Sequence, residues 1–187
     1  MRNPAAAALL GLAVSTTAPL ALAEGWSFPA LTGDNYRAEP TLALIGGQLD
    51  PDVTGADADD LWGLELSLNC PLIQPPSNRI RQQASLTRYD DQGLKITSLE
   101  INPHYVVPVS EHMELGFGPG VGIMKVDSNG NDETLLGLQA GVSLHYRRDA
   151  FFFGAEARYQ ITDKEDFGAG KVDVDNSRVL LKVGINL

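Results

Sequence analysis

Hydrophobic and polar residues alternate one by one along much of this chain. In the clearest stretch, from Met113 to Met124, every odd position from 113 to 123 is apolar and every even position from 114 to 122 is Glu or Gly. A period of two predicts a β-strand with one apolar and one polar face, and no helical period produces it. The same alternation predicts eight strands, at residues 36–47, 62–69, 79–89, 98–107, 113–124, 136–146, 153–161 and 178–187.

The number of segments favours a closed barrel. Residues 36–47 and 79–89 alternate less regularly than the others, and their assignment as strands rests partly on the even strand number of single-chain bacterial outer-membrane barrels. Short periplasmic turns and longer outer loops are typical of such barrels, which would place both termini on the periplasmic side. Tight turns are expected at 75–78, 110–111 and 147–149, and longer polar loops at 50–60, 127–133 and 162–177, with a short turn at 90–93.

The first 23 residues have the pattern of a secretory signal peptide. Arg2 gives a basic start, residues 5–22 are rich in Ala, Leu and Val without a charge, and Ala21-Leu22-Ala23 forms a cleavage site before Glu24. Such a segment is removed on export, so the predicted domains are a signal peptide at 1–23 and a barrel at 24–187. A retained membrane anchor is the alternative interpretation.

Charge and cysteine content exclude several classes of protein. Asp and Glu number 24 against 14 Lys and Arg, giving a formal net charge of −10, and removal of a signal whose only charge is Arg2 makes the chain one unit more negative. Such an acidic chain lacks the clustered basic residues that nucleic-acid binding needs. Cys70 is the only cysteine, so no internal disulfide forms, and we expect its free thiol to face lipid. A closed hydrogen-bonded barrel would stabilise the chain instead.

Alternation alone does not decide which face of the barrel is apolar. A soluble lipocalin-like barrel turns its apolar face inward around a ligand, whereas a membrane barrel turns it outward. Three features favour the membrane barrel: small residues on the polar face, aromatic residues near segment ends, and charges of both signs on the polar face. A narrow interior needs small side chains, and opposite charges can pair across it.

In its pattern the chain resembles the small outer-membrane barrels of the OmpA transmembrane domain and OmpX family, over nearly all of residues 24–187. The resemblance is carried by the glycine-rich alternation at 115–122, by the G-x-E-x-R-Y sequence from Gly154 to Tyr159, and by the alternating C-terminal residues 183–187. The last of these is similar to the family's assembly signal, although Leu187 stands where the family usually has Phe. The resemblance implies the fold and insertion by the barrel-assembly machinery into the outer membrane of a Gram-negative bacterium, and says little about activity.

The candidate functional residues are charged and histidine side chains of the polar face. We expect them to form a structural charge network that fills the interior, because an eight-stranded barrel is filled by side chains and is too narrow for wide-pore transport. The residues assigned to this network are Glu65, Glu100, His104, Glu114, His145, Glu156, Arg158 and Lys182.

A lipid A hydrolase is the alternative enzymatic interpretation. Outer-membrane deacylases of that kind resemble Ser/His/acid hydrolases with an H-x-S pair on one strand. Here Ser143 and His145 occur in the reverse order, with Glu156 on the next predicted strand. They are the residue types of a nucleophile, a base and an orienting acid. Their polar-face position would keep a lipid chain away, so we expect them to belong to the interior network.

Metal binding has two weak candidates. His104, Glu100 and Glu114 could supply ligands from neighbouring strands, although histidines in a charge network are commoner. The acidic stretch 127–133 resembles a calcium loop but fails the EF-hand template, since Gly is fourth and Asp sixth. It and the acidic loop at 50–60 could bind divalent cations weakly and bridge them to lipopolysaccharide.

The sequence therefore predicts an exported, monomeric, all-β protein: an eight-stranded antiparallel up-and-down transmembrane β-barrel of the outer membrane. We expect a structural or surface-interaction role, with no cofactor, no metal and no catalytic site. The expected partners are outer-membrane lipid and lipopolysaccharide. A soluble periplasmic barrel that binds an apolar ligand is the third interpretation.

Overall fold

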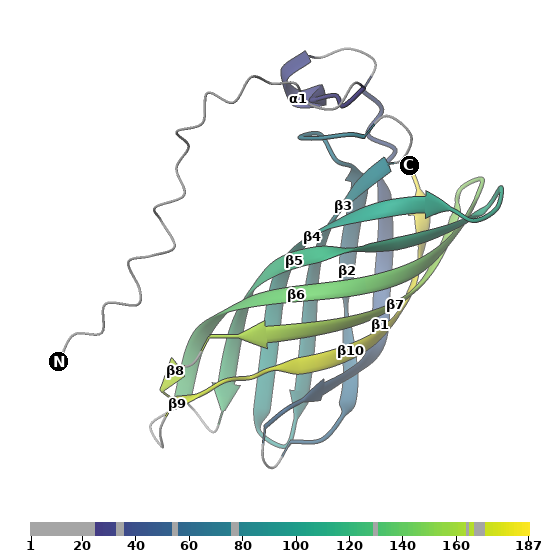
Figure 1. The fold of residues 1–187 in the computed structure, drawn as a ribbon. Helices are drawn as coiled ribbons and strands as arrows, with labels where there is room; N and C mark the ends of the chain where they lie inside the picture. The colour runs from purple at the N-terminus through teal and green to yellow at the C-terminus, as the bar shows by residue number, and fades with distance from the viewer. Residues whose placement is uncertain are drawn as a thin grey trace, which may run out of the picture.

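The structure, a computed structural model, describes residues 25–32, 36–53, 56–75, 79–128, 131–163, 165–166 and 171–187. The predicted signal peptide at 1–23 lies outside them. A tilted antiparallel barrel dominates the fold, preceded by the short helix α1 (Pro29–Thr32) (Figure 1). Among the described residues, no helix has the length and apolar composition to cross a membrane. The barrel strands are β1 (Thr41–Pro51), β2 (Asp59–Asn69), β3 (Arg79–Asp91), β4 (Leu94–Pro108), β5 (Met113–Ser128), β6 (Asn131–Arg148), β7 (Phe151–Thr162) and β10 (Asn176–Asn186).

Each barrel strand pairs antiparallel with its neighbours in the chain, and β1 pairs with β10 to close the sheet. The closing register runs from Thr41 opposite Asn186 to Pro51 opposite Asn176. Two short strands, β8 (Glu165–Asp166) and β9 (Lys171–Val172), form a separate hairpin between β7 and β10. Closure removes every exposed strand edge from the wall. The predicted all-β, eight-stranded up-and-down barrel is confirmed within the described residues.

The two ends of the barrel are named here by the chain termini. The terminal end carries Thr41 and Asn186, with α1 close by, and the far end is the opposite one (Figure 1). At the terminal end β6 and β7 are joined through Asp149, whose φ is 52°. At the far end Gln92 and Gly93 join β3 to β4 with φ of 46° and 86°. Two consecutive left-handed residues match the twist of the flanking strands and so make a tight hairpin.

One of the predicted connections is wrong, and another falls mostly outside the described residues. β5 continues to Ser128 and β6 begins at Asn131, so most of the predicted loop at 127–133 belongs to strands. Its polar composition suggested a loop, but strands that extend beyond an apolar band can be polar on their outer face. At the terminal end β2 stops at Asn69 and β3 begins at Arg79, and residues 76–78 of the tight turn predicted at 75–78 lie outside the described residues.

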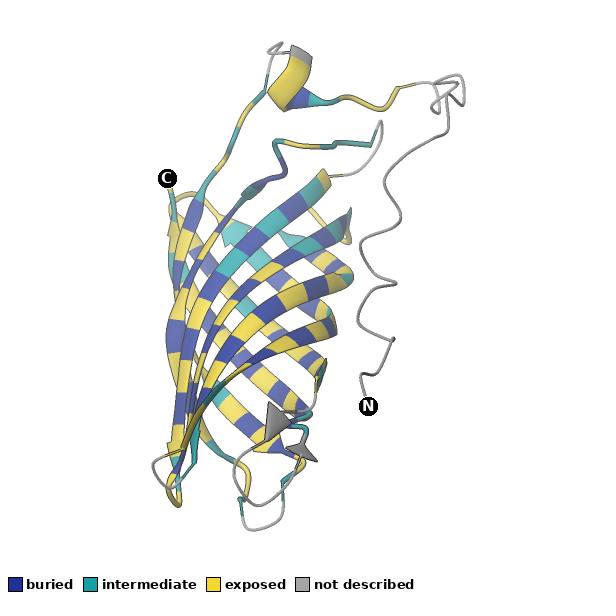
Figure 2. Ribbon diagram, turned by 90° about the vertical axis from the view of Figure 1, so that its left-hand side faces the viewer, coloured by how far each residue is buried: buried dark blue, intermediate teal, exposed yellow. Residues whose placement is uncertain are grey.

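Buried and exposed residues alternate along every barrel strand (Figure 2), and many of the buried side chains are charged. Leu64 and Val179 point outward and remain 49% and 64% exposed, whereas Glu65 and Arg178 beside them are 2% exposed. An exposed apolar surface of this extent is typical of a wall that faces lipid. We call this surface the outer belt; its members include Leu44, Leu64, Leu86, Leu99, Phe117, Val121, Ile123, Leu136, Val179 and Leu181.

The interior is polar from the terminal end to the middle of the barrel and apolar toward the far end. On β4, for example, the inward positions change from His104 and Glu100 to Ile96 and Leu94. The Tyr89 hydroxyl donates to the Asp57 carbonyl at 2.8 Å, which ties the β1–β2 connection to this end. The alternation predicts a polar interior face throughout, and the structure differs from this prediction toward the far end. We call this part of the interior the apolar section; its buried members are Ile45, Leu49, Leu61, Tyr89, Leu94, Ile96, Met124, Val126, Leu135, Val174 and Leu180.

Candidate functional site: a charge network inside the barrel

Strand alternation brings all of the predicted network residues to inward positions. Room for them comes partly from glycines on β5 and β6: a Cβ on Gly120 would overlap the Asn102 side chain, and one on Gly137 would overlap that of Gln160. The predicted residues are 1% to 6% exposed, and they are Glu65, Glu100, His104, Glu114, His145, Glu156, Arg158 and Lys182.

Ion pairs join six buried side chains across the middle of the barrel. Lys182 on β10 stands between two carboxylates, because its Nζ donates to Glu65 Oε2 on β2 and to Glu156 Oε2 on β7, at 2.5 Å each. One lysine thus connects three strands. We call this set the central network; its members are Glu65, Glu100, Glu156, Arg158, Arg178 and Lys182.

Arg158 extends the central network from Glu156 toward the far end. Its guanidinium binds the Glu156 carboxylate on the same strand and donates through Nη1 to Glu100 Oε2 on β4 at 2.5 Å. Arg178 on β10 donates to the other oxygen of Glu100 and to the Gln160 side chain. The guanidiniums of both arginines therefore converge on one carboxylate in the middle of the barrel.

The charges of the central network balance, with three carboxylates and three cations. All six groups are removed from water, which is tolerable only because each has an oppositely charged partner, and the arginines make further hydrogen bonds. Gln83 Oε1, for example, accepts from Arg158 Nη2 at 3.3 Å. Removal of one member would leave an uncompensated charge in the interior, so the pairs depend on one another.

A second cluster lies at the terminal end. Glu114 on β5 accepts hydrogen bonds from Arg79 on β3 and from Arg147 Nε on β6, the latter at 3.0 Å. Arg79 also binds Glu39 at 2.7 Å, and Arg147 Nη1 donates to Thr41 Oγ1 at 2.6 Å. Glu114, a predicted member of the interior network, thus belongs to this separate cluster, which lies where the chain enters the barrel.

Three arginines of these clusters, Arg79, Arg147 and Arg178, were absent from the predicted set. Arg178 occupies one of the alternate positions of β10 that point inward, so the alternation alone was sufficient to identify it. Arg147 was assigned to a tight turn at 147–149, whereas β6 runs on to Arg148 and keeps Arg147 on the inward face after His145. Extending the alternation by two residues would have identified it.

The predicted Ser143–His145 pair does not form. Ser143 Oγ lies 3.1 Å from Nδ1 of His104, and Nε2 of His104 lies 4.0 Å from Glu156 Oε1. Both ring nitrogens of His145 lack a hydrogen-bond partner within the described residues, and its ring packs 5.2 Å from that of Phe152. The serine, the two histidines and the glutamate are all buried inside the barrel.

The predicted metal candidates are not assembled. Glu100 is bound by Arg158 and Arg178, whereas Glu114 belongs to the cluster at the terminal end. In the described part of the chain, no group of three or more His, Cys, Asp or Glu side chains is placed to hold a metal ion. Of the acidic stretch 127–133, Asp127 and Asp132 are opposite each other on β5 and β6, and residues 129–130 lie outside the described ranges.

Cys70 was expected to face lipid with an exposed thiol, whereas it is buried at the edge of a hollow in the outer wall. Its side chain is only 3% exposed. The cysteine follows the last residue of β2, and its backbone N–H donates to the Ile80 carbonyl at 2.7 Å. The alternation of the strand could not predict this burial, because Cys70 lies beyond the end of β2.

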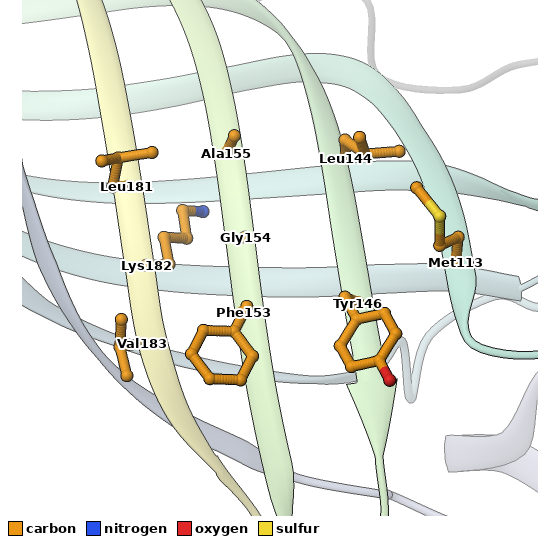
Figure 3. Close-up of a pocket in the computed structure, with 9 residues that line it drawn as sticks. All are labelled: Met113, Leu144, Tyr146, Phe153, Gly154, Ala155, Leu181, Lys182 and Val183. Atoms are coloured by element: carbon orange, nitrogen blue, oxygen red, sulfur yellow. The ribbon is translucent and has the colours of Figure 1, made fainter.

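The outer wall has a shallow apolar hollow of about 350 Å³ over β6, β7 and β10. It lies above Gly154 and Ala155, between the larger side chains of Phe153 and Leu144 (Figure 3). Lys182 is the one charged residue among those lining it, and its ammonium group is turned inward to the central network. The hollow therefore offers an apolar surface and no chemical group for catalysis.

No protein-family model and no curated protein matches the chain. Solved structures do match it. Ail, the attachment invasion locus protein of Yersinia pestis, is 19% identical with a TM-score of 0.52, and the match covers 81% of this chain and 100% of Ail. Neisserial surface protein A is 14% identical with a TM-score of 0.55 and coverage of 88% and 100%.

The N-terminal β-barrel domain of Pseudomonas aeruginosa OprF gives a similar result, with 15% identity, a TM-score of 0.51 and coverage of 81% and 100%. These proteins are small outer-membrane β-barrels, so the resemblance stated from the sequence is confirmed at the level of the fold. At identities below one fifth, the likeness shows that the chain has the fold of the small eight-stranded outer-membrane barrels.

Proposed function

We propose that this chain is an outer-membrane β-barrel of a Gram-negative bacterium with a structural and surface-interaction role and without catalytic activity. The observation that carries the proposal is the inverted burial: an outer belt of exposed apolar side chains surrounds an interior of paired charges. Such a wall needs lipid around it. An interior filled by the central network and the apolar section has no room for wide-pore transport.

A row of basic side chains at the far edge of the outer belt suggests the lipid partner. Arg88 on β3 and Lys125 on β5 share one row of the register, with Thr97 of β4 between them. Adjacent strands are about 4.8 Å apart, so the backbones of Arg88 and Lys125 are about 10 Å apart. The next outward row toward the terminal end is apolar on five strands: Leu64, Leu86, Leu99, Ile123 and Leu136.

The chemistry of this row fits the phosphate groups of lipopolysaccharide. The Arg88 and Lys125 side chains are 49% and 63% exposed, and their ion pairs with Asp90 and Asp132 are exposed too. Exposed pairs contribute little, so exchange for a phosphate costs little. Trp62, opposite Arg88 in the register and 64% exposed, is a residue type enriched at membrane interfaces. Under this proposal the far end faces outward and the termini are periplasmic.

The connections at the far end would then be exposed on the cell surface and would carry out the surface-interaction role. Ail is described as an attachment invasion locus protein and neisserial surface protein A as a surface protein, and we extend such a role to this chain. Ail has also been solved with the heparin analogue sucrose octasulfate. We propose no comparable polyanion for these connections, because their acidic residues would repel it. We propose instead that these acidic residues bind divalent cations weakly and that the cations bridge them to the phosphates of lipopolysaccharide.

Binding of purified lipopolysaccharide to the refolded full chain tests the partner. The variant Arg88→Ala/Lys125→Ala should bind it about tenfold more weakly or worse, a change of about 1.4 kcal/mol. Arg148→Ala, an equally exposed arginine at the terminal end, is the matched control and should bind as the wild type does. Equal affinities of all three proteins would reject the basic row as the binding site. A gel band that migrates alike unboiled and boiled, from a soluble periplasmic fraction, would reject the membrane barrel itself.

One contact favours a competing function, a lipid A hydrolase. Ser143 and His104 are in hydrogen-bond reach of each other, which is the relation of a nucleophile and a base. Against it, Glu156 is already bound by Arg158 and Lys182, and Ser143 is buried. Mass spectrometry of lipid A from cells with and without the protein decides between the two functions. Loss of an acyl chain that Ser143→Ala abolishes would establish the hydrolase.

A further inference from the structure

A second hollow in the outer wall lies near the terminal end, between the β2–β3 connection and strands β3, β4 and β5. Its volume is about 470 Å³. Leu72 and Ile73 of the connection form one side, and Tyr105 and Phe117, whose rings are 5.6 Å apart, form part of the other. No charged side chain lines it, and Gln82 is its one amide. We call it the terminal-end groove.

The floor of the groove is a break in the β4–β5 ladder. The pairing runs from Leu94 to Ile101 and resumes at Tyr105 in the same register, which sets Pro103 opposite Pro119. Neither proline has an N–H to donate, so the ladder lacks hydrogen bonds at this point. Their short rings leave the wall lower than the flanking aromatic rings. A Cβ on Gly118 would overlap the Pro103 carbonyl oxygen, so the two strands approach closely here only because residue 118 is glycine.

The side of the groove formed by Leu72 and Ile73 is held firmly. Gln74 Nε2 donates to the carbonyls of Cys70 and Ile80 at 3.0 Å each, and its Oε1 accepts from the Ile80 N–H at 3.1 Å. The backbones of Gln74 and Ser27 exchange two hydrogen bonds of 2.9 Å. Leu72 is nevertheless 67% exposed. Leu72 thus belongs to a contiguous exposed apolar surface with the rest of the groove, and such a surface marks contact with an apolar partner.

We infer that the terminal-end groove seats one acyl chain of a phospholipid from the periplasmic leaflet. The inference rests on the proposed outer-membrane placement, in which the groove is continuous with the outer belt through Phe117 and Val121 and lies in the leaflet at the terminal end. Gln82 supplies the polar contact. Its amide nitrogen has two N–H groups, of which one reaches the Gln83 carbonyl at 3.3 Å, so the other is available to an ester carbonyl of the lipid.

A matched pair of substitutions on β3 separates this site from general contact with lipid. Gln82→Trp fills the groove and removes the amide. Ala84→Trp adds the same side chain at the next outward position of the same strand, which does not line the groove. Each full-length protein is inserted into vesicles of phosphatidylethanolamine and phosphatidylglycerol, extracted with mild detergent, and examined by native mass spectrometry for retained lipid. Unboiled and boiled gel migration is recorded for each protein.

The wild type and Ala84→Trp should retain one phospholipid per barrel, and Gln82→Trp should retain about tenfold less. Gln82→Leu, which keeps the groove open and removes only the amide, should fall between them. Equal retention by all four proteins overturns the site, as does a mass of two protein chains in place of protein and lipid. If the wild-type barrel inserts but retains no lipid, the acyl-chain site is rejected and the proposed function stands. Chains that fail to insert and show no heat-dependent migration reject the proposed function.

Discussion

Lys182 on β10 and Glu65 on β2 are 117 residues apart in the sequence, yet the lysine Nζ donates to the glutamate Oε2 at 2.5 Å inside the barrel. Strand β1 lies between their strands in the barrel wall, so this bond crosses the interior and does not join paired neighbouring strands. Because Lys182 also binds Glu156, one cation neutralises two buried carboxylates. The stability of the barrel therefore depends on a lysine that no local strand pairing requires.

Lys182→Met tests this dependence. The substitution keeps most of the side-chain volume but leaves Glu65 and Glu156 facing each other without the cation, and breaking a buried pair in this way costs about 3–5 kcal/mol. We expect the urea midpoint of the refolded barrel to fall accordingly. Lys125→Met removes an exposed lysine and should leave the midpoint within about 0.5 kcal/mol of the wild type. Equal midpoints for the two variants would show that the central network does not stabilise the fold.

The inward position of the network residues was predictable because strand alternation is a local property. Glu156 and Arg158 are two residues apart, so they must share a face of β7 wherever the strand lies. The pairing partners were not predictable, because they depend on the register of strands far apart in the sequence. Arg178 binds Glu100 across the interior, between strands that do not neighbour each other.

The contact of Ser143 with His104, in place of His145, has a similar origin. Gly116 is on β5, which lies between the strands of His104 (β4) and Ser143 (β6). A Cβ at Gly116 would stand 3.2 Å from His104 Nδ1 and would overlap the Ser143 hydroxyl. The missing side chain lets His104 reach across β5. By contrast, the ring nitrogens of His145, which lies two residues from Ser143 on the same face of β6, have no hydrogen-bond partner within the described residues. The apolar section likewise depends on a connection that folds back onto the barrel, since the Tyr89 hydroxyl binds the Asp57 carbonyl.

The two buried histidines should respond in opposite ways to replacement by phenylalanine. His145 has no hydrogen-bond partner in the described residues and packs against Phe152, so His145→Phe should raise stability by about 1 kcal/mol. His104 is bound to Ser143, so His104→Phe should lower it by about 1–3 kcal/mol. Unfolding midpoints measured in the same detergent check both. A lower midpoint for His145→Phe would contradict the assignment of His145 as an unpaired side chain.

The apolar section should stabilise the barrel more than the outer belt does. Leu135 is fully buried in this section, whereas its neighbour Leu136 is 61% exposed on the belt. Leu135→Ala should cost about 2–5 kcal/mol through lost contacts and a cavity. Leu136→Ala only exchanges a larger for a smaller lipid-facing side chain, so its cost should be clearly smaller. The comparison is made by urea unfolding in lipid vesicles, and a larger loss for Leu136→Ala would contradict the far-end closure.

Gly118 should tolerate no side chain, because its backbone approaches the Pro103 carbonyl where the β4–β5 ladder is broken. In Gly118→Ala the new Cβ meets backbone atoms, which cannot move as a side chain could, so we expect a loss of about 2 kcal/mol or more. Gly46→Ala is the control, since no atom lies within 4 Å of a Cβ at that position, and its effect should stay within about 0.5 kcal/mol. Unfolding midpoints and the fraction that folds in vesicles measure both. If Gly118→Ala folds as stably as Gly46→Ala, the seam between Pro103 and Pro119 can open, and the floor of the terminal-end groove is not fixed by the backbone.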